Sequence, residues 1–333
     1  MNQPNHESPE LTNSSAGLGH DLRGILLPFT TPFKSNEDLD AEGLRNNLRK
    51  WNASGIVGYV ALGSTGERVH LAESEYARVI EIARQEIPEN LALLVGAGQQ
   101  SSRGTIEEIK RAASLGADGV LVITPSFYRP AISAEALIDH YRTVADASPV
   151  PIILYSMPDL TGIKIEPETV AQLSTHPNIV GIKDSSADIS GFRQTVRLVS
   201  DEFAVLTGNG TVLCDALGAG ARGGILAVGC VASAVCIEIY RLVRVGETQS
   251  AASLQQKLTP LALAVTKRYG IGGLKAALEM IGFAGGNVRA PLKLASVEAR
   301  HDITALLEVI KHINISTIDI NGEREEFAGV IKP

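Results

Sequence analysis

Three apolar runs follow one another in the middle of the chain: Gly119-Val-Leu-Val-Ile-Thr124, Pro151-Ile-Ile-Leu-Tyr155 and Ile179-Val-Gly-Ile-Lys183. Each run is continuously apolar rather than alternating, as in a parallel strand that is covered on both faces. Segments of helical period separate the runs, so the stretch predicts the order strand, helix, strand, helix, strand. This order indicates a parallel sheet with helices packed on its faces.

The same unit recurs along most of the chain. The runs lie roughly 25 to 35 residues apart, which is the length of a strand with its following helix. There are eight: Gly24 to Pro28, Ile56 to Leu62, Leu91 to Ala97, Gly119 to Thr124, Pro151 to Tyr155, Ile179 to Lys183, Phe203 to Thr207 and Gly224 to Val228. Eight units that close within about 220 residues match a (β/α)8 barrel better than an open, doubly wound sheet.

One motif favours the open sheet. The segment Gly218-Ala-Gly-Ala-Arg-Gly223 has the G-x-G-x-x-G pattern of a dinucleotide-binding loop. It follows a predicted helix, Val212 to Leu217, and precedes a strand, whereas a pyrophosphate loop follows a strand and opens a helix. We therefore reject a dinucleotide site and predict an α/β fold, a (β/α)8 TIM barrel with a C-terminal helical appendage.

The 333 residues divide into four segments, of which the barrel is expected to span residues 23–246. Residues 1–22 are polar and contain no Lys or Arg, unlike a secretory or transit peptide, so we expect a flexible leader and a cytoplasmic protein. Residues 247–313 have helical periodicity and are expected to form C-terminal helices. Residues 314–333 form a tail without a clear period, to which we assign no role.

Composition and charge exclude two classes of partner. The net charge is −7, with 37 acidic residues spread among 30 basic ones, so no basic stripe is available for nucleic acid. The longest apolar runs, such as Leu261 to Val265, are far shorter than the ~20 residues that span a membrane. Cys214, Cys230 and Cys236 form neither a C-x-x-C pair nor an even set, so we expect buried, reduced thiols.

Capping signals predict where one helix begins and ends. Thr105 followed by Glu108 has the pattern of a capping box, and Gly116 follows the last residue of an apolar helical stripe. We therefore expect the helix after the third strand to begin at Thr105 and to end at Gly116.

The chemistry of a (β/α)8 barrel lies at the carboxyl ends of its strands. The polar residues at these ends are Thr30, Thr31, Ser64, Thr65, Glu67, Gln99, Thr124, Tyr155, Lys183, Thr207 and Asn209. They include a single Lys and neither a His nor a cluster of carboxylates, whereas a catalytic metal needs three or more converging ligands. We expect no metal and no cofactor.

Lys183 occupies the last inward position of a buried strand, where a charged residue is costly unless it is used or paired. Asp184 is expected to face away from the lumen, because adjacent strand residues point to opposite faces. A desolvated amine suits imine formation with a carbonyl substrate, and Tyr155 on the neighbouring strand is the candidate acid and base. The structural alternatives are a Lys that extends to solvent and a Tyr that only packs at the rim.

A short turn follows the second strand. The segment Gly63-Ser-Thr-Gly-Glu67 precedes a helix, so its hydroxyls and backbone N–H groups are candidates to hold a carboxylate. It lacks the Gly-Lys-Ser/Thr ending of a nucleotide loop. An ordinary turn without ligand is the alternative interpretation.

Four motifs occur in an order and spacing that resemble one family of barrels. They are the Gly63-Ser-Thr-Gly-Glu67 turn, Thr124-Pro-Ser-Phe-Tyr-Arg-Pro130, Leu154-Tyr-Ser-Met-Pro158 with Thr161-Gly162, and Gly181-Ile-Lys-Asp-Ser185. From about Gly24 to Leu294 the chain resembles the dihydrodipicolinate synthase/N-acetylneuraminate lyase family. The resemblance implies a (β/α)8 barrel, usually a homotetramer, that forms a Schiff base with pyruvate or releases pyruvate from a 2-oxo acid.

The resemblance also implies roles for individual residues. Lys183 is implied to be the Schiff-base lysine and Tyr155 the proton shuttle. The residues implied to contact substrate are Ser64 and Thr65 at the pyruvate carboxylate, Ile225 beside pyruvate, Tyr128, and Ser185, which resembles a residue of the 4-hydroxy-2-oxoglutarate aldolases. Two further segments resemble that branch, Ala264 to Lys275 and Arg289 to Leu292.

Two positions depart from the family pattern. The synthases have an Arg just before the Thr-Gly pair, where it receives the carboxylate of the aldehyde substrate, and this chain has Leu160 there. Charge-assisted hydrogen bonds are worth ~1.5 to 3 kcal/mol each, so Leu160 disfavours a charged aldehyde. Phe127 stands where the family usually has the Tyr that extends the proton relay across the subunit interface.

These observations predict a class I pyruvate-dependent aldolase that cleaves or forms a 4-hydroxy-2-oxo acid, most similar to 4-hydroxy-2-oxoglutarate aldolase. Its expected partners are pyruvate and an aldehyde. Three alternatives stay open: 4-hydroxy-tetrahydrodipicolinate (dihydrodipicolinate) synthase, a pyridoxal phosphate barrel that uses Lys183, and a non-catalytic paralogue that binds a 2-oxo acid.

Overall fold

The structure is a computed structural model, and it describes Leu18, residues 21–318 and residues 324–328. Most of the predicted leader, residues 1–17 and 19–20, lies outside the described residues. Leu18 and Leu22 pack with the apolar side chains inside the barrel.

Eight parallel strands close into a barrel in chain order, and the last strand pairs with the first through Gly24 and Gly223. The strands are β1 (Gly24–Pro28), β2 (Gly58–Ala61), β3 (Ala92–Ala97), β4 (Gly119–Ile123), β5 (Ile152–Ser156), β6 (Ile179–Asp184), β7 (Ala204–Thr207) and β8 (Gly223–Ile225). The predicted TIM barrel is therefore confirmed. A side chain at Gly223 would collide with the Gly24 backbone, so the closing pair of strands depends on a residue without a Cβ.

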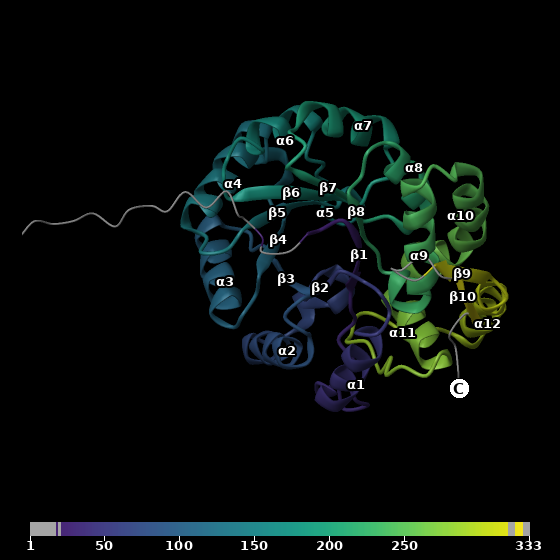
Figure 1. Cartoon of the computed structure of the whole chain (residues 1–333). Coiled ribbons are helices and arrows are strands. Elements are labelled where there is room, and N and C mark those ends of the chain that lie inside the picture. The colour runs from purple at the N-terminus through teal and green to yellow at the C-terminus, as the bar shows by residue number, and fades with distance from the viewer. Residues whose placement is uncertain (1–17, 19–20, 319–323, 329–333) are drawn as a thin grey trace, which may run out of the picture.

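Helices surround the barrel, as Figure 1 shows. They are α1 (Ala41–Trp51), α2 (Glu73–Glu86), α3 (Ser102–Ser114), α4 (Ala134–Ala147), α5 (Pro158–Thr161), α6 (Pro167–Leu173), α7 (Ile189–Leu198), α8 (Leu213–Gly218) and α9 (Gly229–Arg244). Short 3₁₀ turns are η1 (Ser64–Gly66), η2 (Arg68–His70), η3 (Arg129–Ala131) and η4 (Gly210–Val212). The turn η1 follows β2, so it lies at the end of the barrel where catalytic groups are expected.

Helix α3 begins earlier than its capping pattern predicted. Its N-cap is Ser101, whose side chain accepts a hydrogen bond from the Gly104 N–H, so Thr105 lies inside the first turns of the helix. Glu108 does not cap the helix, because its carboxylate binds Arg68 and the Gly98 N–H instead. The capping-box prediction was wrong because Ser101 caps the helix one turn earlier, the Thr105 hydroxyl bonds to the Ser101 and Gln99 backbone, and Glu108 has a tertiary partner.

Two apolar layers build the core. The outer layer lies between the strands and the surrounding helices. The inner layer fills the lumen and includes Leu26, Val60, Leu94, Ile153, Tyr155, Leu206 and Ile225. Each such side chain contributes roughly 1.5–3 kcal/mol on burial, so the lumen is a packed core and only its mouth is available for chemistry.

The C-terminal helices gather beside α9 at one edge of the barrel (Figure 1). They are α10 (Thr248–Leu263), the π-helical segment η5 (Ala264–Arg268), α11 (Gly270–Met280) and α12 (Val297–Lys311). The tail, for which the sequence predicts no element, contains the antiparallel pair β9 (Asn314–Ile318) and β10 (Arg324–Ala328).

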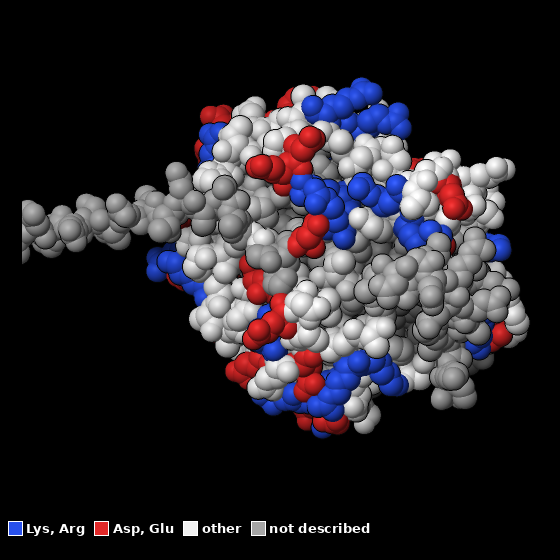
Figure 2. Space-filling model, viewed as in Figure 1, with Lys and Arg blue, Asp and Glu red and all other residues white. Residues whose placement is uncertain are grey.

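Charged side chains of both signs are spread over the face of the molecule that Figure 2 displays. On the face that Figure 2 displays, basic and acidic side chains of the described residues lie in small mixed groups. Within the described part of the chain, no helix combines the length and apolar character needed to cross a membrane. Cys230 and Cys236 are buried free thiols, as predicted, and burial raises the pKa of Cys236 to about 12. Cys214 is also a free thiol, but it is only half-buried, so the prediction of burial was wrong for this residue.

Candidate active site

Pairing between β5 and β6 brings the two predicted catalytic side chains together. Tyr155 is the register partner of Lys183. Between Ile152 and Ile153 the register shifts by one residue, because Val180 is an extra residue on β6. After this bulge, the side chain of Lys183 lies on the same face as Tyr155, which belongs to the lumen layer.

Lys183 is buried, with 4% of its surface exposed. Its Nζ lies 4.3 Å from the centroid of the Tyr155 ring. Among the described residues, no carboxylate lies within ion-pair distance of this amine. The adjacent Asp184 instead accepts a hydrogen bond from the Ser186 N–H at 2.7 Å, and burial raises the pKa of its carboxyl group. Lys183 therefore does not extend to solvent, which was the structural alternative, because its amine is enclosed beside the Tyr155 phenol.

The Tyr155 hydroxyl has electrostatic support from three side chains. Its oxygen lies 3.4 Å from the Ser64 Oγ. Burial acts to raise the pKa of Tyr155, but the Lys183 charge and hydrogen bonding by Ser64, Ser185 and Lys183 outweigh it, so the pKa is lower than usual. A phenol with a lowered pKa beside an amine is suited to exchange protons with a substrate bound to that amine.

The turn after β2 brings Ser64 to the same centre and holds Thr65 as the next residue along the chain. Ser64 contacts Tyr155, and Thr65 is buried. The turn is fixed from below by Thr31, whose Oγ1 donates a 2.7 Å hydrogen bond to the Gly66 carbonyl. Glu67 ends the turn in the left-handed conformation, with φ of 55°. The hydroxyls of the turn are thus held by the framework of the barrel.

Ser185 and Ile225 complete the surroundings of the lysine. Ser185 is buried, and its backbone N–H donates to the Ser156 carbonyl at 3.0 Å. Ile225 is fully buried in the lumen layer that contains Tyr155. The structure therefore brings Lys183, Tyr155, Ser64 and Ser185 into one cluster, with Ile225 among the apolar residues beneath it.

Gly208 is a site residue that the sequence reasoning missed. A Cβ at this position would lie 2.0 Å from the Ser185 Oγ and 2.6 Å from the Lys183 Cε. The absence of a side chain on Gly208 therefore gives Lys183 its space. The signal was present in the sequence, since Gly208 separates two residues, Thr207 and Asn209, that were noted at the end of a strand.

The exposed rim carries apolar side chains. Leu160 on α5 is 64% exposed, while Phe127 and Tyr128 are 75% and 70% exposed and contact each other edge to face. No contact joins Tyr128 to Lys183 or Tyr155 among the described residues. Tyr128, which is predicted to contact substrate, therefore does not join the cluster around Lys183 within this chain.

A cation lies close to Leu160 at this rim. The Arg129 side chain packs on Gly162, where a Cβ would lie 2.7 Å from the Arg129 Nη1. Gly162 ends the short helix that carries Leu160. Arg129 has no ion-pair partner among the described residues, and the sequence reasoning gave it no role.

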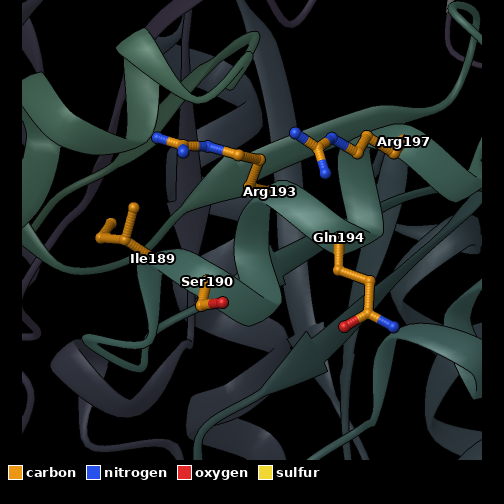
Figure 3. A pocket seen from close by; sticks show the side chains of 5 residues that line it. All are labelled: Ile189, Ser190, Arg193, Gln194 and Arg197. Atoms are coloured by element: carbon orange, nitrogen blue, oxygen red, sulfur yellow. The ribbon is translucent and has the colours of Figure 1, made fainter.

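A hollow of about 430 Å³ lies elsewhere, on the outer ring of helices. Figure 3 shows its lining side chains, Ile189, Ser190, Arg193, Gln194 and Arg197, all of which come from α7. Residues of a single outer helix line this hollow, so it does not belong to the cluster at the strand ends.

The geometry can be compared with known proteins. A model of the dihydrodipicolinate synthetase family matches residues 21–310. A 4-hydroxy-tetrahydrodipicolinate synthase of Methanospirillum hungatei JF-1 is 33% identical over 289 residues, which cover 86% of this chain and 98% of that protein.

Solved structures agree in fold and length. The dihydrodipicolinate synthase of Thermotoga maritima superposes with a TM-score of 0.82 at 31% identity, covering 87% of this chain and 99% of the other. YagE of E. coli K12, solved in complex with pyruvate, has a TM-score of 0.81 at 28% identity, with coverage of 88% and 99%.

The match over residues 21–310 includes every strand of the barrel and every residue of the cluster around Lys183. Members of this family are pyruvate-dependent lyases and synthases that act through a Schiff base, and this chain is an enzyme of that class. The chain belongs to the dihydrodipicolinate synthetase family.

Proposed function

We propose that Lys183 forms an imine with pyruvate and that the resulting enamine is joined to an aldehyde, or released from one. The observation that carries this proposal is the enclosed Lys183 amine, which lies 4.3 Å from the Tyr155 ring and has no carboxylate partner among the described residues. An amine without a fixed counter-ion can be used as a nucleophile, whereas an ion-paired one is held as ammonium.

The neutral Lys183 amine attacks C2 of pyruvate, and Tyr155 donates a proton to the C2 oxygen so that water leaves. The deprotonated Tyr155 then takes a proton from C3, which gives the enamine and restores the phenol. In the forward direction C3 of the enamine bonds to the aldehyde carbon, whose oxygen takes up a proton from Tyr155. Water then hydrolyses the imine and restores the Lys183 amine. Ser64 and Thr65 hold the carboxylate of pyruvate throughout.

The aldehyde that the relatives favour is the substrate of 4-hydroxy-tetrahydrodipicolinate synthesis. Seven relatives, at 33–38% identity, have the name of that synthase. Our first candidate is therefore this synthase activity, ahead of the 4-hydroxy-2-oxoglutarate aldolase activity that the sequence favoured. Arg129 supports it, because its unpaired guanidinium offers a carboxylate-binding cation near the position where Leu160 replaces the family Arg.

Leu160 supports a second candidate, cleavage of a 4-hydroxy-2-oxo acid. Its side chain is 64% exposed at the rim and adds apolar surface where a charged substrate would need a donor. Ser185, which resembles a residue of the 4-hydroxy-2-oxoglutarate aldolases, lies in the cluster around Lys183.

Borohydride reduction in the presence of pyruvate, followed by mass spectrometry, tests the shared first step. We expect one adduct, on Lys183, and an unmodified Lys183 would contradict the proposal. Coupled assays with aspartate semialdehyde and with 4-hydroxy-2-oxoglutarate then separate the two candidates. If Arg129 receives the aldehyde carboxylate, Arg129→Gln raises the KM for aspartate semialdehyde and Arg129→Lys raises it less. Binding of 2-oxo acids without turnover of either substrate would instead favour a non-catalytic paralogue.

The oligomeric state belongs to the same proposal. Phe127 and Tyr128 expose 75% and 70% of their surfaces at the rim, which is more than a monomer needs to leave in water. We expect a homotetramer, in which a partner subunit covers this pair. Analytical ultracentrifugation of the wild type and of Phe127→Asp checks this expectation.

A further inference from the structure

A second buried lysine lies outside the catalytic cluster. Lys275 on α11 has a side chain only 1% exposed, and its Nζ lies 2.5 Å from the Glu67 Oε1, whose side chain is equally buried. The Nζ also donates a 2.5 Å hydrogen bond to the Asn287 carbonyl. The catalytic mechanism uses neither member of this ion pair.

Glu67 is the last residue of the turn that carries Ser64 and Thr65. Its Oε2 accepts a 3.1 Å hydrogen bond from the Arg289 N–H, so one carboxylate receives contacts from two separate C-terminal segments. The Oε1 atom is buried and has no aligned hydrogen bond among the described residues, so the Lys275 charge is its compensation. The C-terminal helices therefore hold the turn from outside the barrel.

The turn needs such support because Glu67 has a left-handed backbone, with φ of 55°. A residue other than Gly adopts this conformation only where its surroundings fix it. Thr31 fixes the neighbouring Gly66 carbonyl, and the ion pair fixes the side chain of Glu67 itself.

The ring of Phe33 packs beneath the same charges. Lys275 Nζ lies 4.5 Å and Arg289 Cζ 4.2 Å from its centroid. Arg289 is itself paired with Glu75 on α2 and donates to the Glu37 carbonyl. These contacts hold Lys275 in place. Its ion pair with Glu67 therefore restricts movement of the turn.

We propose that Lys275 is a positioning residue for substrate binding: through its buried ion pair with Glu67, the C-terminal helical segment sets the turn that presents Ser64 and Thr65 to the carboxylate of pyruvate. This inference rests on the proposed role of those two hydroxyl residues. It predicts that breaking the ion pair weakens pyruvate binding more than it slows the chemistry at Lys183.

The test compares Lys275→Met with the wild type in steady-state kinetics and in borohydride trapping. We expect the pyruvate KM to rise about tenfold or more while kcat falls less than about threefold. Trapping with hydroxyacetone, which has a ketone but no carboxylate, is expected to proceed at the wild-type rate. A variant that is damaged as a whole would lose both reactions equally, and that result would overturn the proposal.

Two further variants separate positioning from stability. Glu67→Gln/Lys275→Met removes both buried charges, so we expect it to recover stability relative to Lys275→Met while its pyruvate KM stays raised. Recovery of the KM together with stability would overturn the proposal. If Lys275→Met does not fold, this double variant decides. Lys275→Arg, which keeps the charge, is expected to return the KM toward the wild-type value.

A matched control breaks an ion pair of similar length elsewhere. Arg45 on α1 pairs with Glu86 on α2 at 2.6 Å, and neither residue contacts the turn. Arg45→Met is expected to leave the pyruvate KM unchanged. If the wild type itself forms no pyruvate adduct on Lys183, the proposed function fails. If it forms the adduct but Lys275→Met binds pyruvate normally, only the positioning role fails.

Discussion

Lys183 and Lys275 are both almost completely buried, with 4% and 1% of their surfaces exposed, but their neighbours differ. Lys275 faces a carboxylate at 2.5 Å; burial lowers its pKa, and Glu67 offsets only part of that lowering. Lys183 faces a phenol ring and has no carboxylate partner among the described residues. The difference shows how one barrel holds a structural ammonium and a reactive amine: the counter-ion, and not the depth of burial, separates them.

The largest effect is expected when Lys183 is replaced. Lys183→Met removes the nucleophile, so we expect kcat to fall on the order of a thousandfold or more and the pyruvate adduct to disappear. The free energy of unfolding should not decrease, because an unpaired buried amine is lost. Activity assays and urea denaturation measure the two effects. A marked loss of stability would show that Lys183 resembles Lys275 after all.

Lys275→Met should show the opposite pattern: a small effect on kcat and a large loss of unfolding free energy. It leaves the Glu67 carboxylate buried without compensation, which costs about 3–5 kcal/mol of unfolding free energy. Urea denaturation next to Lys183→Met measures the contrast. A cost below about 1 kcal/mol would mean that the ion pair does not distinguish the two lysines.

Tyr155→Phe tests the role of the Tyr155 hydroxyl, since Lys183 has this phenol as its neighbour where Lys275 has a carboxylate. The ring and its packing remain, but the proton donor is lost, so kcat should fall about a hundredfold or more. The rate of borohydride trapping with pyruvate should fall as well, because water leaves the carbinolamine more slowly. Unchanged trapping would assign the proton transfer to another group.

The smallest effect is a shift in pH dependence. Burial raises the pKa of Tyr155, while Lys183, Ser64 and Ser185 lower it further than burial raises it. The deprotonated phenol is the base, so kcat should rise with pH as Tyr155 loses its proton. Ser64→Ala removes one lowering contact, so the pKa rises and the rising limb moves to higher pH, by less than about one unit.

The sequence predicted the barrel well because its signal is local. Eight apolar runs with helices between them specify parallel strands, and the observed strand bounds differ from the predicted runs by only a few residues. Lys183 and Tyr155 could be predicted to meet because adjacent parallel strands end at the same rim.

Contacts between distant segments escaped prediction. The partner of Glu67 lies on α11, far along the chain, and no local pattern indicates that Lys275 reaches it. Gly208 matters through the space that it leaves for Lys183, and its position at a strand end does not show which side chain uses that space. The start of α3 was misplaced because Glu108 binds Arg68, a residue of another loop.

The extra residue Val180 on β6 determines which side chain of that strand lies opposite Tyr155. Side chains alternate along a strand, so the bulge decides whether Lys183 or Asp184 enters the lumen. Had β6 continued from Ile179 without the bulge, Ile182 would face Tyr155, and Lys183 would pair with Ser156 and leave the lumen. Identity of the two residues is therefore not enough to inherit the chemistry: a homologue or a designed relative must also preserve the register that pairs Lys183 with Tyr155.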